Sequence, residues 1–382
     1  MTVHVTRKRN VVTGAIAHPG MIQKKKILLL GEYGAFSRRI HRALSRSPHI
    51  ECVIGVADAR RARSQWGADG ALVTVLGDPH SIHGAIKDVF AVVNTRGPFL
   101  DRNYTVAEQC AERGVHYVDP ADSNEYVSGL GRLTRKAEKS GSLIVTGAAA
   151  APAVTALLVD MLAPEFDRIH EIHACLAPGK NDYRDRATAR AILRYSDHVL
   201  RMKEKGRWHE FKGWTRPRPV YFPAPVGRRR SYVCDMLDLD IFPKRYGAQT
   251  VTFRTALSSR ASNFVLSFCR WLRNRGMIRS LPSPMLTLLN AFSTLPGFGD
   301  PNGGLGVEVH GDKGGDRITH SIFLVARAGN ASAIAAAPSI ALVKKWVREG
   351  VSAAGVTTCV GLLEWPDVRD ELLDHDIVLV RT

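Results

Sequence analysis

Apolar residues in the first part of the chain form short continuous runs, and stretches with helical spacing separate these runs. A continuous apolar run is typical of a strand that is buried on both faces of a sheet. Strands that alternate with helices predict βαβ units and a doubly wound parallel sheet of the Rossmann type, which is an α/β fold. The six predicted strands are 26–30, 52–58, 71–77, 89–94, 115–119 and 142–147.

The pattern changes after residue 150, where apolar and polar residues alternate with a period of two. Such alternation is typical of antiparallel strands with one solvated face. Helical stretches are expected at 187–196 and 260–275, so this part predicts a second, α+β domain with a largely antiparallel sheet. The alternating stretches are 168–176, 249–257, 304–311 and 318–328.

These patterns divide the chain into four parts. We expect a mobile tail at 1–24, a first, Rossmann-type domain at 25–150 and a second, α+β domain at 151–335. The segment 336–382, with a helix at 338–349 and a strand at 357–363, is expected to return to the first domain. Met21 is an alternative start of the protein, because the fold begins just after it.

Composition narrows the class of protein further. No apolar run reaches the ~20 residues of a membrane-spanning helix, and the N-terminus lacks the apolar core of a secretory signal. Six cysteines are scattered without a CxxC pair, which argues against a zinc site or a disulfide scaffold and favours the cytoplasm.

The formal net charge of +17 indicates a basic surface. A positive field suits a phosphate-bearing cofactor and a carboxylate substrate. The basic residues are spread along the chain and no RNA-binding or zinc-finger motif occurs, so we expect a small-molecule substrate and no nucleic acid.

A glycine-containing turn follows the first strand. Gly31 permits a tight turn, Gly34 lets a pyrophosphate approach the backbone, and Ser37 is small enough for the following helix to pack closely. The N–H groups at the start of this helix would then point at the phosphates. The predicted phosphate-binding residues are Gly31, Gly34, Ala35, Phe36 and Ser37.

The end of the second strand gives conflicting evidence on the cofactor. Asp58 stands where a carboxylate binds the ribose of NAD. Arg60 and Arg61 follow directly and suit the 2′-phosphate of NADP. A solvated Asp58 that only starts a turn is the third alternative, so NAD and NADP both remain open.

A further loop is expected at the carboxyl end of the fourth strand, where Gly97-Pro98 enforces an irregular turn after Asn94. The segments KILLLGEYGAFSRRIHRAL, VVNTRGPFLDRNYTVAEQCAERGVHYVDPAD and GSLIVTGAAAAPAV resemble the saccharopine dehydrogenase-like oxidoreductases. The resemblance continues through RATARAILRY, GLGVEVHG and TTCVGLLEW.

The resemblance implies that the domain at 25–150 binds NADP and that the domain at 151–335 serves substrate binding and dimerisation in a homodimer. It also implies hydride transfer between nicotinamide and an amine–imine carbon. It assigns Asn94, Gly97 and Pro98 to the loop on the nicotinamide side. Ala57-Asp58 departs from the Gly-Arg of many relatives, which leaves the NADP preference open. Asp185 and Asp197 replace glycines of relatives, so the substrate loop is expected to differ.

The sequence offers few candidates for catalytic or substrate-binding groups. His116 and Asp119 are expected to follow the fifth strand and to face the nicotinamide as acid or base; packing and helix capping are the alternatives. Arg184 and Arg186 suit a substrate carboxylate, unless they are solvated. The strand histidines at 170, 173 and 310 show no metal-ligand spacing, so no metal is predicted.

The stretch 262–289 contains one apolar stripe beside arginines. A core or dimer helix is the favoured interpretation, and association with a membrane surface is the alternative. The sequence thus predicts an NAD(P)-dependent oxidoreductase that acts on a small, carboxylate-bearing substrate at an amine, imine or carbonyl carbon. The alternative is a non-catalytic, regulatory dinucleotide-binding protein. An epimerase or short-chain reductase is disfavoured, because the first domain lacks a Tyr-x-x-x-Lys pair.

Overall fold

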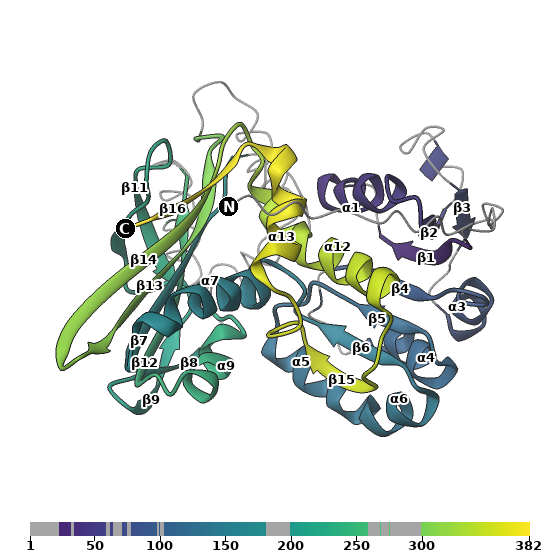
Figure 1. The fold of residues 1–382 in the computed structure, drawn as a ribbon, viewed down its shortest axis with the longest axis horizontal. Helices are drawn as coiled ribbons and strands as arrows, with labels where there is room; N and C mark the ends of the chain where they lie inside the picture. The colour runs from purple at the N-terminus through teal and green to yellow at the C-terminus, as the bar shows by residue number, and fades with distance from the viewer. Residues whose placement is uncertain are drawn as a thin grey trace, which may run out of the picture.

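The computed structural model describes two sheets with helices packed on them (Figure 1). The described residues are 23–31, 34–58, 62–63, 71–74, 78–97, 99, 103–180, 199–258, 268, 275 and 299–382. The helix predicted at 187–196 and nearly all of the one predicted at 260–275 lie outside them, as does the stretch 1–22.

The first sheet is parallel throughout and has the strand order β15-β6-β5-β4-β1-β2-β3. Without β15 this is the order of the dinucleotide-binding Rossmann fold. The predicted α/β Rossmann sheet is therefore confirmed, with one additional strand. The strands are β1 (Lys25–Leu30), β2 (Ile50–Val56), β3 (Ala71–Thr74), β4 (Ala91–Asn94), β5 (His116–Val118), β6 (Leu143–Thr146) and β15 (Gly355–Thr358).

Helices cover both faces of this sheet, as a doubly wound fold requires. Ile27 and Leu29 point into one core with α1 and α12, while Leu28 and Leu30 point into a second core with α3, α4 and α6. Burial on both faces explains the unbroken apolar run of β1. The helices are α1 (Ala35–Ser45), α3 (Pro79–Ala85), α4 (Thr105–Arg113), α5 (Asn124–Leu130), α6 (Thr134–Ser140) and α12 (Ala331–Glu349).

The second sheet has the order β10-β11-β12-β7-β13-β14-β16, and only β12 and β7 pair in parallel. The predicted largely antiparallel sheet is confirmed. Its helices are α7 (Thr155–Leu162) and α9 (Asp238–Arg245). The strands are β7 (Arg168–Ala177), β10 (Arg218–Tyr221), β11 (Arg228–Val233), β12 (Thr250–Leu257), β13 (Gly303–Lys313), β14 (Asp316–Ala326) and β16 (Ile377–Arg381). A separate hairpin consists of β8 (Val199–Glu204) and β9 (Arg207–Lys212).

The last fifty residues contribute to both sheets. Helix α12 packs against α1, and β15 pairs with β6. Strand β16 instead pairs with β14 of the second sheet. Helix α12 begins at Ala331 rather than at the predicted residue 338, because the alanine-rich run before Pro338 has high helix propensity and is mostly buried.

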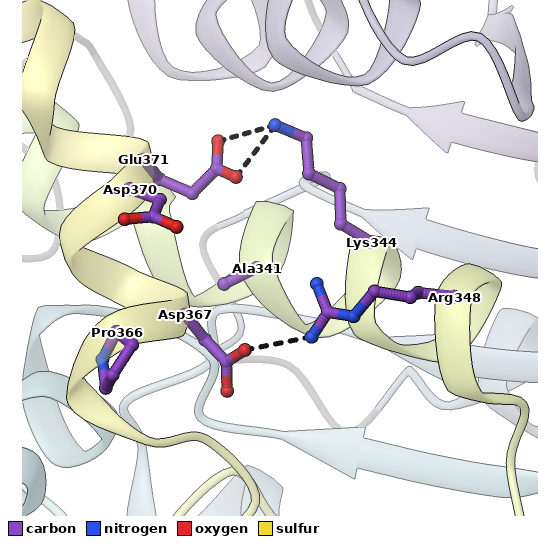
Figure 2. A pocket seen from close by; sticks show the side chains of 7 residues that line it. All are labelled: Ala341, Lys344, Arg348, Pro366, Asp367, Asp370 and Glu371. Atoms are coloured by element: carbon purple, nitrogen blue, oxygen red, sulfur yellow. Dashed lines mark hydrogen bonds and ion pairs between the residues drawn. The ribbon is translucent and has the colours of Figure 1, made fainter. Parts of the chain in front are cut away.

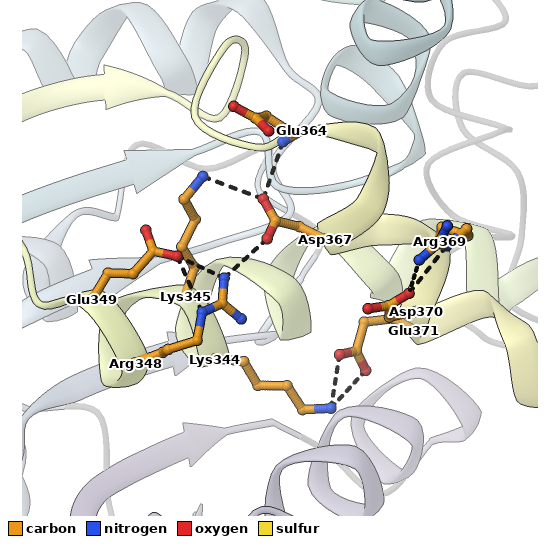
Figure 3. Close-up of polar contacts among 9 residues, drawn as sticks. All are labelled: Lys344, Lys345, Arg348, Glu349, Glu364, Asp367, Arg369, Asp370 and Glu371. Carbon is orange, nitrogen blue, oxygen red and sulfur yellow. Dashed lines mark hydrogen bonds and ion pairs between the residues drawn. The ribbon is translucent and has the colours of Figure 1, made fainter. Parts of the chain in front are cut away.

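Ion pairs attach α13 (Trp365–Leu372) to α12, as Figures 2 and 3 show. The Lys344 ammonium lies 2.7 and 2.9 Å from the two carboxylate oxygens of Glu371. Asp367 accepts bonds from Lys345 and Arg348. All of these residues except Lys345 line a pocket between the helices, and every charged group that lines it is already paired, so the pocket serves packing rather than ligand binding.

Within the described residues, no helix combines the length and apolar character that crossing a membrane requires.

Candidate dinucleotide-binding site

The strand order reverses between β1 and β4, and ligands of open α/β sheets bind outside the carboxyl ends of the strands at such a point. Leu30 ends β1 and Asn94 ends β4, and these two residues are paired in register. The loops that follow them contain most of the predicted cofactor-binding residues. The sheet thus brings Gly31 and Asn94 to one edge.

Gly31 lies in a space too small for any side chain. A Cβ atom there would lie 2.1 Å from Thr95 Oγ1 and 2.7 Å from Ser37 Oγ. Thr95 Oγ1 donates a hydrogen bond to the Leu30 carbonyl at 2.9 Å, so the proton between Ser37 and Thr95, 2.9 Å apart, comes from Ser37. These bonds tie helix α1 to the loop after β4, directly over Gly31.

Gly34 has the opposite environment, because a Cβ added to it would meet no atom within 4 Å. It is the extended N-cap residue of α1, and no side chain caps the helix. No acidic residue lies in the first turn of α1. The first N–H groups of the helix, including those of Ala35 and Phe36, therefore face a space that a phosphate can enter, and the helix dipole favours an anion there.

These features fit a dinucleotide pyrophosphate. The site has a glycine that permits the turn, a second glycine that leaves room for the phosphates, and a helix whose N-cap has no side-chain hydrogen bond and whose first turn has no acidic residue. Ser37 is 5% exposed and occupies the packing position that the sequence predicted for it.

The side chain of Asn94 is fixed from both sides. Its Nδ2 donates to the Tyr117 hydroxyl at 3.0 Å, and its Oδ1 accepts from the Arg96 N–H at 3.2 Å. The Gly97 N–H donates to the Thr95 carbonyl at 2.8 Å, which closes a tight turn. The hydroxyl of Tyr117 lies 3.3 Å from that of Tyr126 in α5. The loop after β4 is thus held by a buried polar network.

Replacing Tyr117 with phenylalanine is expected to lower the free energy of unfolding by about 1–2 kcal/mol, because it leaves the buried Asn94 amide without an acceptor. The affinity for dinucleotide should fall as well, since the loop after β4 loses an anchor. Urea unfolding and cofactor titration measure the two effects. Tyr126→Phe is the matched control, because its hydroxyl does not contact Asn94; an equal loss in both variants would contradict the role given to Tyr117.

Asp119 is fully buried directly after β5. Its Oδ1 accepts from Thr146 Oγ1 at 2.6 Å and from the Ala121 N–H at 3.0 Å, while its carbonyl accepts from the Ala148 N–H. Burial raises the pKa of the carboxyl to about 6, and the Thr146 bond offsets part of that effect. Asp119 thus joins the loops after β5 and β6; its participation in catalysis stays a prediction.

His116 does not lie where the sequence placed it. It is the first residue of β5 rather than a residue after it, and pairs with Ala91 at the opposite edge of the sheet from Asn94. Its Nδ1 accepts from the Leu143 N–H at 3.1 Å, and its ring packs on Phe90 and Trp346. Burial lowers its pKa. The strand lies within the predicted range 115–119, but His116 begins it, and ligands of such a sheet bind at the carboxyl ends of the strands, so the structure does not support the expectation that His116 faces the nicotinamide.

The remaining predicted residues are distributed as follows. Asp58 is exposed and lies two residues beyond β2, with its carbonyl accepting from the Ala62 N–H. Gly97 is exposed in the loop after β4. The predictions for Arg60, Pro98, Arg184 and Arg186 fall outside the described residues.

Two residues at this edge were not selected from the sequence. Thr95 directly follows the fourth strand, and its hydroxyl at the end of that strand is the sequence feature that could have identified it as a site residue. Asp235 follows β11 of the second sheet and accepts from Asn124 Nδ2 at 3.3 Å, next to the carboxyl end of β5. It is 8% exposed. No local pattern predicts this contact, because it depends on the packing of the two sheets. Among the described residues, no His, Cys, Asp and Glu side chains form a group suited to a metal ion.

The fold and the turn after β1 define a dinucleotide-binding domain of the Rossmann class. Residues 27–145 match the family model described as the saccharopine dehydrogenase NADP binding domain, so this part of the chain is similar to that domain. The resemblance inferred from the sequence is thereby confirmed.

Solved structures share the fold over most of the chain. Apo saccharopine dehydrogenase (L-Glu forming) from Saccharomyces cerevisiae superposes with a TM-score of 0.66 at 13% identity, covering 94% of this chain and 100% of the other. An engineered D-amino acid dehydrogenase bound to NADP+ gives a TM-score of 0.50 at 14% identity, covering 93% and 100%. A comparison with curated proteins gives no match. At these identities the superpositions show the fold alone.

Proposed function

We propose that the protein is an NAD(P)-dependent oxidoreductase that transfers a hydride at an amine, imine or carbonyl carbon of a small substrate. The observation that carries this proposal is the turn at the switch point, where Gly31, Ser37 and Thr95 close tightly and Gly34 leaves the N-terminus of α1 open. The family match of residues 27–145 to an NADP-binding domain supports it.

The residues of this chain would act on the cofactor by binding and orientation. The helix N–H groups at Ala35 and Phe36 would bind the pyrophosphate, and the loop held by Asn94 would border the nicotinamide. The bound nicotinamide supplies the hydride donor or acceptor. The region around Asp235 and Asn124, where the two sheets meet, is the proposed entrance for the substrate.

The substrate is proposed to carry a carboxylate, with Arg184 and Arg186 as its binding partners. The expected cytoplasmic location and homodimer remain part of the proposal. The overall charge of +17 supports an anionic ligand, because a positive field raises its local concentration.

The exposed carboxylate of Asp58 is expected to set the choice of cofactor. If it binds the ribose, Asp58→Ala should shift the ratio of NADPH to NADH affinity by about tenfold toward NADPH, since the repulsion of the 2′-phosphate is removed. Fluorescence titration with both cofactors measures the ratio. Glu51→Ala, at an exposed position in β2, is the control. An unchanged ratio would remove Asp58 from the site.

The direct test of the proposal is turnover. The purified chain is titrated with NADH and NADPH and then assayed, in both directions, with panels of amino acids, 2-oxo acids with ammonia, and aldehydes. Binding followed by hydride transfer to any class supports the proposal. Absence of binding of both cofactors at high concentration would overturn it.

A non-catalytic dinucleotide-binding protein is the second candidate. It is favoured by the place of His116 at the amino edge of the sheet and by the complete burial of Asp119, whose Oδ1 is bonded to Thr146 and to the Ala121 N–H. Tight cofactor binding without turnover on any panel is the outcome that this candidate expects.

A further inference from the structure

The segment 199–230 contains a disproportionate share of the positive charge of the protein. It has ten lysines and arginines and two glutamates, a net charge of +8 against +17 for the whole chain. The segment forms two consecutive hairpins, β8–β9 and β10–β11. Most of its cationic side chains are exposed.

The register of β8 and β9 separates an inner from an outer face. Leu200 and Met202 are almost fully buried in the main core and thus define the inner face. Because side chains alternate along a strand, the outer face carries Val199, Arg201 and Lys203 of β8 and, directly opposite, Lys212, Glu210 and Trp208 of β9. The outer face therefore has three cations and one carboxylate.

Apolar side chains are exposed among these cations. Val199 is 50% exposed and Trp208 is 39% exposed, on the same face. On the next hairpin, Tyr221 is 66% exposed and pairs in register with the exposed Arg228. Exposed aromatic and aliphatic groups beside lysines and arginines are the combination that the headgroup region of an anionic membrane accommodates.

The acidic residues of the segment do not neutralise it. Glu204 forms an ion pair with Arg216 on the inner side of the hairpin, and Glu210 is the single carboxylate on the outer face. The exception among the arginines is Arg229, which is buried and bonded to Asp300, and so belongs to the interior. The exposed cations therefore retain most of the net charge.

We propose that the outer face of β8–β9 is a docking surface for anionic phospholipid headgroups. A single-stranded nucleic acid fits less well. The Arg201 guanidinium lies 5.3 Å from the centroid of the Trp208 ring and covers a face on which a base would stack, and Val199 offers nothing to a base. Both apolar residues suit the boundary between headgroups and acyl chains.

The experiment is co-sedimentation of the full chain with vesicles of phosphatidylcholine alone or mixed with phosphatidylserine. Binding is expected only to the mixed vesicles and should weaken as salt is added. The combined variant Arg201→Gln, Lys203→Gln and Lys212→Gln should bind them at least about tenfold more weakly. Trp208→Ala should also weaken binding, without any change of charge.

The matched control removes the same charge elsewhere, by Lys87→Gln, Lys139→Gln and Lys313→Gln at exposed positions outside the segment. It should retain binding. Equal weakening of both combined variants, or no binding of the wild type to mixed vesicles, would overturn the proposal. So would binding of an oligonucleotide that competes with the vesicles and is lost in the same variants. Cofactor titration of each variant is a separate readout, so failure here leaves the proposed oxidoreductase function untouched.

Discussion

Replacing Gly31 with alanine is expected to lower the free energy of unfolding by about 3 kcal/mol and to abolish measurable dinucleotide binding. The new methyl group would lie 2.1 Å from Thr95 Oγ1 and 2.7 Å from Ser37 Oγ, so these side chains must move. Overpacking costs about 1–3 kcal/mol, and each lost hydrogen bond of the Ser37–Thr95–Leu30 chain adds about 1 kcal/mol. Urea unfolding and titration with NADPH and NADH measure the two losses.

Gly34→Ala is the matched control for this prediction. Its Cβ would meet no atom within 4 Å, and its backbone at φ −144° is one that alanine adopts readily. The variant should therefore keep the stability of the wild type. Its affinity for the cofactor should fall, because the methyl group enters the space through which the phosphates approach α1. A Gly31→Ala variant as stable and as tightly binding as the wild type would contradict the geometry described here.

The sequence located both glycines but could explain only part of their roles. Strand and helix periodicity around Gly31 and Gly34 is local, so the turn could be predicted from neighbouring residues. The requirement for glycine at position 31 depends on Thr95, which reaches the turn only because β1 and β4 are neighbours in the sheet. Such a contact is set by strand order, and apolar patterning does not specify it.

His116 shows where periodicity alone is insufficient. An alternating apolar run gives the approximate position of a strand but does not fix its ends, and β5 has only three residues. The observed strand 116–118 lies within the predicted strand 115–119, so His116 lies near the amino end of the strand in both. Asp119 ends the predicted strand and directly follows the observed one, so it lies at the carboxyl edge in both.

The C-terminal part illustrates long-range pairing. A strand was predicted at 357–363, whereas β15 begins at Gly355 and β16 pairs with the second sheet. Asp235 likewise approaches Asn124 only through the packing of the two sheets. Contacts between segments more than a hundred residues apart determine which residues border the candidate site. No single stretch of sequence contains both partners of such a contact.

Removal of the buried carboxyl of Asp238 is expected to abolish a large pH dependence of stability. Asp238 is fully buried at the start of α9, with Oδ1 2.5 Å from Thr155 Oγ1 and without a hydrogen-bond partner for Oδ2. Burial raises its pKa from the ordinary value of an aspartate to about 7, and the Thr155 bond offsets part of the effect. Thr155 Oγ1 also lies 3.1 Å from the Pro152 carbonyl, so a protonated Asp238 can donate to Thr155 while Thr155 donates to Pro152.

The sign of the effect follows from the raised pKa. The folded state binds the proton more tightly than the unfolded state, so this contribution to stability is complete below about pH 4 and is lost as the pH rises through about 7. The loss is on the order of 4 kcal/mol, and Asp238→Asn, which does not titrate, should not show it. The measurement is urea unfolding of both proteins from pH 4 to pH 8. Asp119 is present in both proteins, so its contribution cancels in the difference between their free energies of unfolding. Asp88→Asn on the surface is the control, and a difference between Asp238→Asn and the wild type that stays constant across this range would contradict a buried, neutral Asp238.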